Sequence, residues 1–407
     1  MMSGSVQLKH SLRCWGNSFM TSLCRVIICI GLPCTFPGAC TAPYRHAQLR
    51  PSDSSFSGID AALGGTELPA SRQVNVLLIH GMGTHTTDWA LSLMSQVSQA
   101  LSLRWTGPLP NPETLANGAL LYQVVLSDET RVAHIAAVLW SPITADAKKT
   151  LCYDATQATP TCTASNTLSK DKRARINADL KNQLMDDAMS DVTFYMNESG
   201  GKRVREAIED ALLRTLSNEG MTLASLSSGA VPTAKNVPLF IISESLGSKM
   251  IVDSLQEFES DRQTQTFAQQ ARGNIHSLFL LANQIPLLNL GLVDSNGRPD
   301  PYQHLKKLAR DRHNYRKNRL PTSPLQVVAF SDPNDLLTYQ LQPDALPPDE
   351  ATISNVVVSN DCTWFGLFEN PDTAHTGYFE TNPVVNAIAH GSASVHTSVG
   401  GRCAKQH

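Results

Sequence analysis

Residues 243–247, Ser-Glu-Ser-Leu-Gly, have the residue types and spacing best suited to a chemical step. They follow the apolar run 237–242 and lead directly into an amphipathic stretch that ends near Leu255. A sharp strand-to-helix turn of this kind exposes the central Ser245 hydroxyl, and the helix amides beside it favour negative charge on that oxygen. The chemistry indicated is nucleophilic attack by serine. The alternative is an ordinary serine-rich helix cap that follows a strand.

A serine nucleophile needs a base and an acid, and candidates for both occur further along the chain. The apolar run 325–330 is followed by Asp332 and Asp335, and Asp335 precedes an apolar pair. His375 lies past the last expected strand and before the final expected helix. Either aspartate also suits a simple turn cap.

A glycine-containing loop, His80-Gly-Met-Gly83, follows the buried run 74–79. Gly81 and Gly83 let the backbone approach a bound group closely, while His80 is expected to be structural. A phosphate-binding turn is the alternative reading of this loop. It lacks the third spaced glycine and the Lys-Ser/Thr pair that nucleotide-binding loops carry.

The elements that must position these residues are short apolar strands separated by helical patterns. Continuous apolar strands of this kind predict an α/β fold with a mostly parallel central sheet covered by helices on both faces. We expect strands at residues 74–79, 237–242, 275–282, 325–330 and 353–358, and a hairpin of residues 119–126 and 132–140 whose second strand joins the main sheet.

Two segments are candidates for contact with a substrate. Residues 145–200 break the strand–helix rhythm and predict an insertion that forms a cap or lid. Residues 282–292 are unusually apolar for a loop after a strand. They line an acyl pocket in one interpretation and are core residues at the start of a helix in the other, which is slightly favoured.

The order of these features resembles the α/β-hydrolase superfamily, in particular its lipase- and esterase-like serine hydrolases. In that superfamily the oxyanion loop, nucleophile, acid and histidine follow one another along the chain, each just past a strand. The four segments above have the same order, and the resemblance covers roughly residues 74–391. It departs from the family pattern at Ser243, where a glycine is usual.

The resemblance implies a role for each residue at the site. Ser245 is the nucleophile, and His375 is the base because the family's histidine lies past the last strand and before the final helix. Asp335 is the acid because the family pattern places it ahead of an apolar pair, and Asp332 is the second choice. The backbone amides of Met82 and Leu246 form the oxyanion hole. The implied activity is cleavage of a carboxylic ester or related acyl bond, in a small molecule or a lipid, without a cofactor or metal. Two alternatives stay open: an acyltransferase with the same triad, and a non-catalytic binding protein of the cell envelope.

The first part of the chain predicts export. Basic residues precede the apolar run 26–34, and small residues follow it. We therefore expect an export signal or lipoprotein-type leader over residues 1–42, with Cys40 as a candidate for lipidation and membrane association. Residues 43–72 are rich in small and polar residues and predict a flexible linker, which leaves 73–407 as the hydrolase domain.

Cysteine content and net charge restrict the surroundings and partners further. An exported chain meets an oxidising compartment, where Cys152 is expected to pair with Cys162, and Cys362 with Cys403. Free thiols are the alternative. The formal net charge of −3 gives no field that would attract nucleic acid, and no metal-binding spacing of the C-x-x-C or H-E-x-x-H kind occurs.

Overall fold

The structure is a computed structural model, and it describes residues 41–43, 47–64, 72–108, 110–163, 168–218, 220–226, 229, 231–260, 263–317, 319, 323–364 and 367–395. The predicted leader lies outside this part of the chain except for its last residues, and Cys403 lies outside it too. No helix within these ranges is long and apolar enough to cross a membrane.

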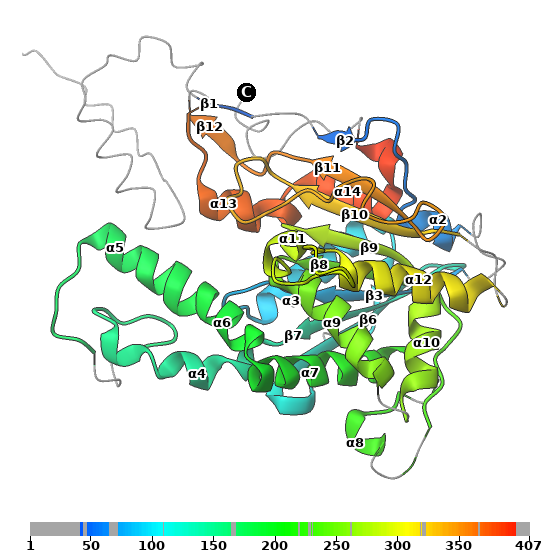
Figure 1. Ribbon diagram of the computed structural model, residues 1–407, viewed down its shortest axis with the longest axis horizontal. Coiled ribbons are helices and arrows are strands. Elements are labelled where there is room, and N and C mark those ends of the chain that lie inside the picture. The colour runs from blue at the N-terminus through cyan, green and yellow to red at the C-terminus, as the bar shows by residue number, and fades with distance from the viewer. Residues whose placement is uncertain are drawn as a thin grey trace, which may run out of the picture.

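Within the described residues, ten strands form one mixed sheet (Figure 1), in the order β2-β11-β10-β9-β8-β3-β7-β6-β4, with β5 paired to β6. The six strands from β11 to β7 run parallel. They are β3 (Gln73–Ile79), β7 (Val132–Leu139), β8 (Leu239–Glu244), β9 (Ile275–Leu281), β10 (Leu325–Ser331) and β11 (Ala351–Val357). The prediction of an α/β fold with a mostly parallel sheet is therefore confirmed.

Antiparallel strands complete both edges of the sheet. They are β2 (Gln48–Arg50), β4 (Arg104–Thr106), β5 (Glu113–Thr114) and β6 (Leu120–Ser127). β6 and β7 are the predicted hairpin, and β7 joins the main sheet as expected. β1 (Thr41–Pro43) and β12 (Cys362–Trp364) pair with each other outside the sheet.

Helices cover both faces because successive side chains of the parallel strands point to opposite sides. In β3, Val76 and Leu78 join one core, whereas Leu77 and Ile79 join the other. The first core is covered by α2 (Ile59–Leu63), α3 (Thr87–Leu101) and α14 (Asn382–His390); the second by α7 (Glu198–Leu216), α9 (Leu246–Ser260), α10 (Gln265–Asn274) and α12 (Gln303–Lys317).

The prediction of a flexible linker over residues 43–72 is wrong for its central part. Residues 48–50 form β2, which pairs with β11, and Ile59 and Leu63 of α2 are fully buried. The segment adds an edge strand and a short helix to the body of the fold. The apolar residues of the segment are too few and too irregularly spaced to predict a strand or a helix. The strand that β2 pairs with lies some 300 residues away in the chain, so no local pattern indicates the pairing.

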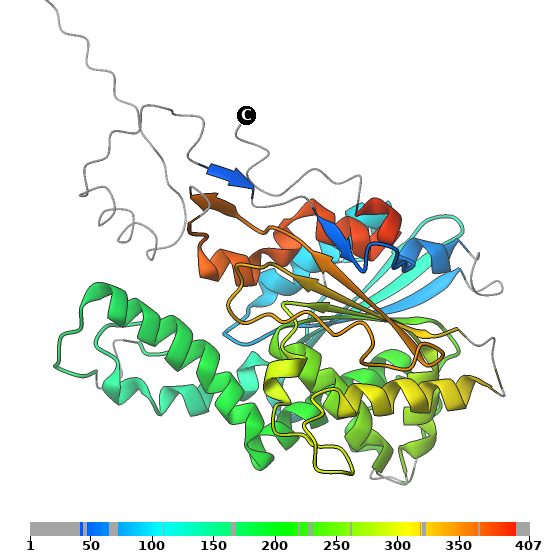
Figure 2. The ribbon, with the colours of Figure 1, turned by 45° about the horizontal axis from the view of Figure 1, so that its top comes forward.

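The insertion predicted at residues 145–200 forms a helical arm at the left of both ribbon views (Figures 1 and 2). Its elements are α4 (Ala145–Lys149), α5 (Arg175–Leu180), the π-helix η4 (Lys181–Met189) and α6 (Ser190–Met196). A disulfide joins Cys152 to Cys162, as predicted.

The remaining short helices lie in the loops. They are α8 (Leu223–Leu226), α11 (Ile285–Leu288), α13 (Pro371–Thr376) and the 3-10 turns η1 (Ala116–Gly118), η2 (Ser141–Ile143), η3 (Cys152–Asp154), η5 (Gly377–Glu380) and η6 (Ser392–Ser394).

Candidate active site

Ser245 occupies the turn between the end of β8 and the start of α9. Its φ of +52° lies in the left-handed region, which a residue with a side chain seldom adopts. The Ser245 amide donates a 2.8 Å hydrogen bond to the carbonyl of Leu281 at the end of the neighbouring strand β9. The sheet thus holds Ser245 in a strained backbone conformation of the kind that clusters at functional sites.

Small residues are required on both sides of this turn. A Cβ at Gly247 would stand 2.7 Å from the His80 carbonyl oxygen and 2.9 Å from that of Ile79, and neither backbone atom is free to move. Ser243, where the hydrolase family usually has glycine, is fully buried, so the packing accommodates its side chain. The turn therefore packs directly against the loop that follows β3.

The structure brings Ser245, His375 and Asp335 into one hydrogen-bonded row. The Nε2 atom of His375 is 3.1 Å from the Ser245 Oγ. On the other side of the ring, Nδ1 is 2.9 Å and 3.0 Å from the two carboxylate oxygens of Asp335. Ser245 and Asp335 follow the ends of β8 and β10, and His375 lies in α13, in the segment that follows β11 and β12. The parallel strands β8, β10 and β11 are far apart in sequence and end at the same edge of the sheet.

Asp335 is held by groups other than the histidine. Its Oδ1 accepts the amide N–H of Leu337 at 2.9 Å, and its Oδ2 accepts the Tyr378 hydroxyl at 3.0 Å. The carboxyl group is fully buried. Tyr378 was not among the sequence candidates, because no motif or spacing in residues 371–382 distinguishes this tyrosine from other buried aromatic residues. Its hydroxyl also accepts the Asp332 amide at 2.8 Å, so it joins both candidate acids.

Asp332, the second choice for the acid, does not lie against the histidine. Its carboxylate accepts the amides of Asn334 at 2.9 Å and Asn360 at 2.6 Å, which ties the loop after β10 to the loop after β11. Burial raises its pKa, and it faces the carboxyl group of Glu369, whose pKa burial and the Asp332 charge raise to about 8. Asp332 therefore stabilises the two loops against each other and does not contact the imidazole.

Two carboxyl groups set the charge around the imidazole. Burial by itself lowers the pKa of His375, but the hydrogen bond and charge of Asp335, aided by Glu244, raise this pKa above its ordinary value. Glu244 immediately precedes the serine, and burial raises its pKa to about 7. A histidine in this setting accepts a proton readily, as a general base must.

Comparisons of the chain with protein-family models, with curated proteins and with solved structures find no match. The chemistry of the site therefore rests on its geometry. A serine hydroxyl, an imidazole and a carboxylate in one row can pass the serine proton to the imidazole and leave a nucleophilic oxygen.

The backbone on the other side of Ser245 can stabilise negative charge. Leu246 is the first residue of α9, and the first amides of a helix have no partner within the helix. A Cβ at Gly81 would lie 2.7 Å from the Ser245 Cβ, so the loop that carries Met82 touches the serine directly. The two segments predicted to form an oxyanion hole thus flank Ser245.

His80, in the same loop, is a neutral structural residue. Its Nε2 accepts the amide N–H of Trp140 at 3.0 Å, so Nδ1 carries the proton and donates to the Gly81 carbonyl at 2.7 Å. Burial lowers its pKa well below the ordinary value. The ring stacks between Trp140 and His85, which joins the loop after β3 to the end of β7.

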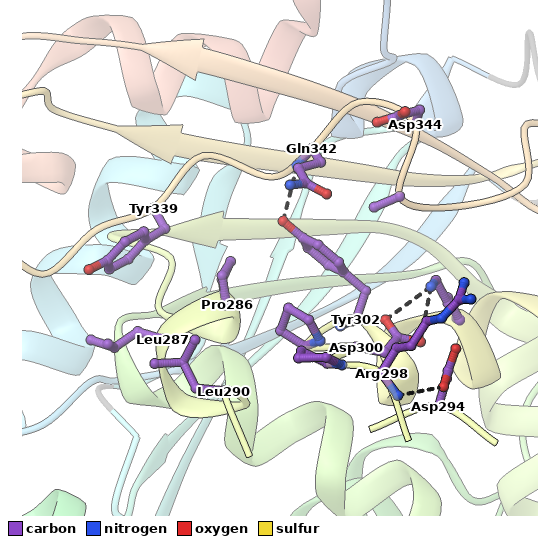
Figure 3. Close-up of a pocket in the computed structure, with 14 residues that line it drawn as sticks. Pro286, Leu287, Leu290, Asp294, Arg298, Asp300, Tyr302, Tyr339, Gln342 and Asp344 are labelled. Carbon is purple, nitrogen blue, oxygen red and sulfur yellow. Dashed lines mark hydrogen bonds and ion pairs between the residues drawn. The ribbon is translucent and has the colours of Figure 1, made fainter. Parts of the chain in front are cut away.

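A hollow of about 630 Å³ lies between the loops after β9 and β10 (Figure 3). Pro286, Leu287 and Leu290 line one end, and Asp294 and Arg298 lie at the other. Neither interpretation of residues 282–292 holds for the whole segment. Ile285 is buried in the core, whereas Leu290 is 66% exposed beside the hollow.

Hydrogen bonds join the lining of this hollow to the segment that follows β9, whose last residue contacts Ser245. Tyr339, in its lining, donates its amide to the Asn283 carbonyl at 2.8 Å, and the Asn283 side chain donates to the Tyr339 carbonyl at 2.9 Å. Asn283 lies two residues after Leu281, which accepts the Ser245 amide. A second hollow of about 400 Å³ lies between the insertion and Thr84.

No group of three or more His, Cys, Asp or Glu side chains suited to holding a metal ion occurs in the described part of the chain.

Proposed function

We propose that this protein is a serine hydrolase of the α/β-hydrolase type that cleaves a carboxylic ester or a related acyl bond. One observation carries the proposal: Asp335, His375 and Ser245 form a continuous hydrogen-bonded row, and the serine at its end sits in a strained strand-to-helix turn. The parallel sheet, the order of the residues along the chain and the flanking amides are consistent with the same function.

In the first half of the proposed reaction, Ser245 Oγ attacks the carbonyl carbon of the ester while His375 Nε2 takes its proton. Asp335 keeps the imidazole in the correct tautomer and stabilises its positive charge. The carbonyl oxygen becomes negative, and the amides of Met82 and Leu246 donate hydrogen bonds to it. The C–O bond to the alcohol then breaks, and the alcohol leaves with the proton from His375.

In the second half, water attacks the acyl group on Ser245 and gives one proton to His375. The acid leaves, and that proton returns to Ser245 Oγ, which restores the starting state. An alcohol in place of water would make the protein an acyltransferase with the same residues. The substrate class is a small-molecule or lipid ester.

We also propose that the protein works outside the cytoplasm. The disulfide between Cys152 and Cys162 supports this, because such bonds persist in oxidising compartments.

The test is reaction with a fluorophosphonate, which phosphonylates activated serines. The purified protein is expected to gain one adduct, mapped to Ser245 by mass spectrometry, and to hydrolyse nitrophenyl esters. Ser245→Ala and His375→Ala are expected to lose both properties. A folded wild-type protein that neither reacts nor cleaves esters would refute the proposal.

His390 provides a matched control for the histidine. It also pairs with an aspartate, Asp60, at 2.7 Å, but it is 41% exposed and lies in α14. His390→Ala is expected to keep the adduct and the esterase activity. If His390→Ala also lost the adduct and the esterase activity, the losses in His375→Ala could not be attributed to a specific role of His375. The assignment of His375 as the base would then fail.

A further inference from the structure

The insertion is fastened to the loop after β3 by a buried ion cluster. Lys148, in α4, has its ammonium group 2.7 Å from Asp187 Oδ1 and 2.9 Å from Asp191 Oδ2. The side chains of Lys148 and Asp191 are 2% and 0% exposed. Charges this deep are tolerated only when they are paired and hydrogen-bonded. The cluster is thus a fixed part of the fold, unlike the pairs on the surface of the insertion.

The same two carboxylates accept hydrogen bonds from the backbone of the loop. Gly83 donates its amide to Asp191 Oδ2 at 2.8 Å, and Thr84 donates its amide to Asp187 Oδ2 at 2.9 Å. The Thr84 hydroxyl donates to Asp187 Oδ1 at 2.6 Å. Two consecutive amides of the loop are therefore held by residues that lie more than 100 positions further along the chain.

These contacts fix both sides of Met82. Gly81 packs against Ser245 on one side, and Gly83 is tied to Asp191 on the other. Gly83 has a φ of +94°, which turns the chain toward the insertion. The Met82 N–H lies in the Gly81–Met82 peptide plane, and the Gly83 N–H lies in the next plane, on the other side of the Met82 Cα. Because Asp191 holds the second plane, it restricts the direction of the Met82 N–H through the φ and ψ angles of Met82.

The helical arm presents both carboxylates together. Asp187 lies in the π-helix and Asp191 in α6, four residues apart, which places both side chains on one side of the arm facing Lys148. π-helical turns are rare and occur often at functional sites.

We propose that Lys148, Asp187 and Asp191 are positioning residues through which the insertion holds the Met82 amide in place to receive negative charge. This inference rests on the proposed function, because the direction of that amide matters only if an oxyanion forms beside it. Within the insertion this role is confined to these three residues, which contact the loop after β3 or pair with those that do.

The test compares Asp187→Ala, Asp187→Asn and a control. Asp187 is 30% exposed, so its truncation is tolerated better than that of fully buried Asp191. Asparagine keeps an oxygen that accepts the Thr84 amide, whereas alanine keeps none. The control is Asp146→Ala, which removes a 94% exposed aspartate paired with Lys149 on the same insertion.

Amide hydrogen exchange of the 80–86 segment and ester hydrolysis are measured on folded protein of equal melting temperature. In Asp187→Ala, the Thr84 amide is expected to exchange faster, and kcat to fall about 10- to 100-fold with KM within about twofold. Asp187→Asn is expected to recover part of both. The control is expected to match the wild type. If Asp187→Ala does not fold, Asp191→Asn, which keeps the acceptor and removes the charge, takes its place.

The outcomes separate this inference from the proposed function. Unchanged exchange at Thr84, or faster exchange with unchanged kcat, would overturn the positioning role while leaving the hydrolase intact. A rise in KM with unchanged kcat would overturn it too, because it would indicate a substrate contact. Faster exchange in a protein whose wild type cleaves no ester and takes no fluorophosphonate would instead refute the proposed function.

Discussion

Gly81 lies so close to Ser245 that a Cβ at position 81 would stand 2.7 Å from the serine Cβ and 3.4 Å from its Oγ. Real Cβ atoms do not approach other carbons to 2.7 Å, so even alanine would force the loop and the serine apart. The absence of a side chain at this position is what lets the loop that carries Met82 reach the serine.

Gly81→Ala is therefore expected to lower kcat/KM about 100-fold, since a displacement near 1 Å at a reacting centre costs about this much. The melting temperature is expected to fall as well, because Asp191 and Asp187 hold the loop and limit how far it can move, so activity is compared on folded protein. Gly291→Ala is the matched control: a Cβ there meets nothing within 4 Å. Steady-state kinetics on both variants makes the comparison, and equal activities would show that the close contact has no catalytic meaning.

Substitution of the two candidate acids, Asp335 and Asp332, is expected to lower kcat by different factors. Asp335→Asn removes the charge that faces His375 Nδ1 and is expected to lower kcat about 10³- to 10⁴-fold, with the fold intact. Asp332→Asn leaves the imidazole paired and is expected to lower kcat less than about tenfold, while reducing the melting temperature because Asp332 is a buried brace. The reverse ranking of kcat would make Asp332 the functional acid.

The strands and the order of the site residues could be predicted because each parallel strand is buried on both faces and so forms an unbroken apolar run. Loops at the carboxyl ends of such strands converge, which brought Ser245, Asp335 and His375 together as expected. Periodicity was sufficient for the strands, and the resemblance to the order of the α/β-hydrolase superfamily was needed for the site residues.

Contacts between distant segments could not be predicted in the same way. β2 pairs with β11 through backbone bonds that leave no pattern in its three residues. Tyr378 reaches Asp335 only because a 3-10 turn points it inward. The basic and acidic residues of the insertion look like an ordinary solvated helix, and only the fold shows that Lys148, Asp187 and Asp191 are turned toward the loop after β3.

Glu244 is expected to affect how kcat/KM depends on pH. Its negative charge faces His375 and raises the histidine pKa, and burial raises the pKa of Glu244 itself to about 7. Glu244→Gln removes this charge, so the pKa of His375 falls and the imidazole stays neutral at lower pH. The acid limb of the kcat/KM profile is expected to move to lower pH by up to about 1 unit. A profile unchanged or moved to higher pH would contradict this.

Glu369 predicts how the stability of the fold depends on pH. Burial and the charge of Asp332 raise the pKa of Glu369 from 4.5 to about 8. Between these values the folded protein keeps a proton that the unfolded chain has released. The contribution of Glu369 to the free energy of unfolding must therefore fall as the pH rises through this window, because the unfolded state binds fewer protons. Above about pH 8, Asp332 and Glu369 are both charged, and they repel each other behind the site.

Glu369→Gln replaces the titrating group with a neutral amide that still donates a hydrogen bond toward Asp332. Urea unfolding at pH 5, 6, 7 and 8 is expected to give a shallower fall in stability for this variant than for the wild type, with the two closest near pH 5. Glu113→Gln, which removes a carboxyl group that is 47% exposed, should keep the wild-type slope. Parallel slopes for wild type and Glu369→Gln would mean that Asp332 and Glu369 share no proton.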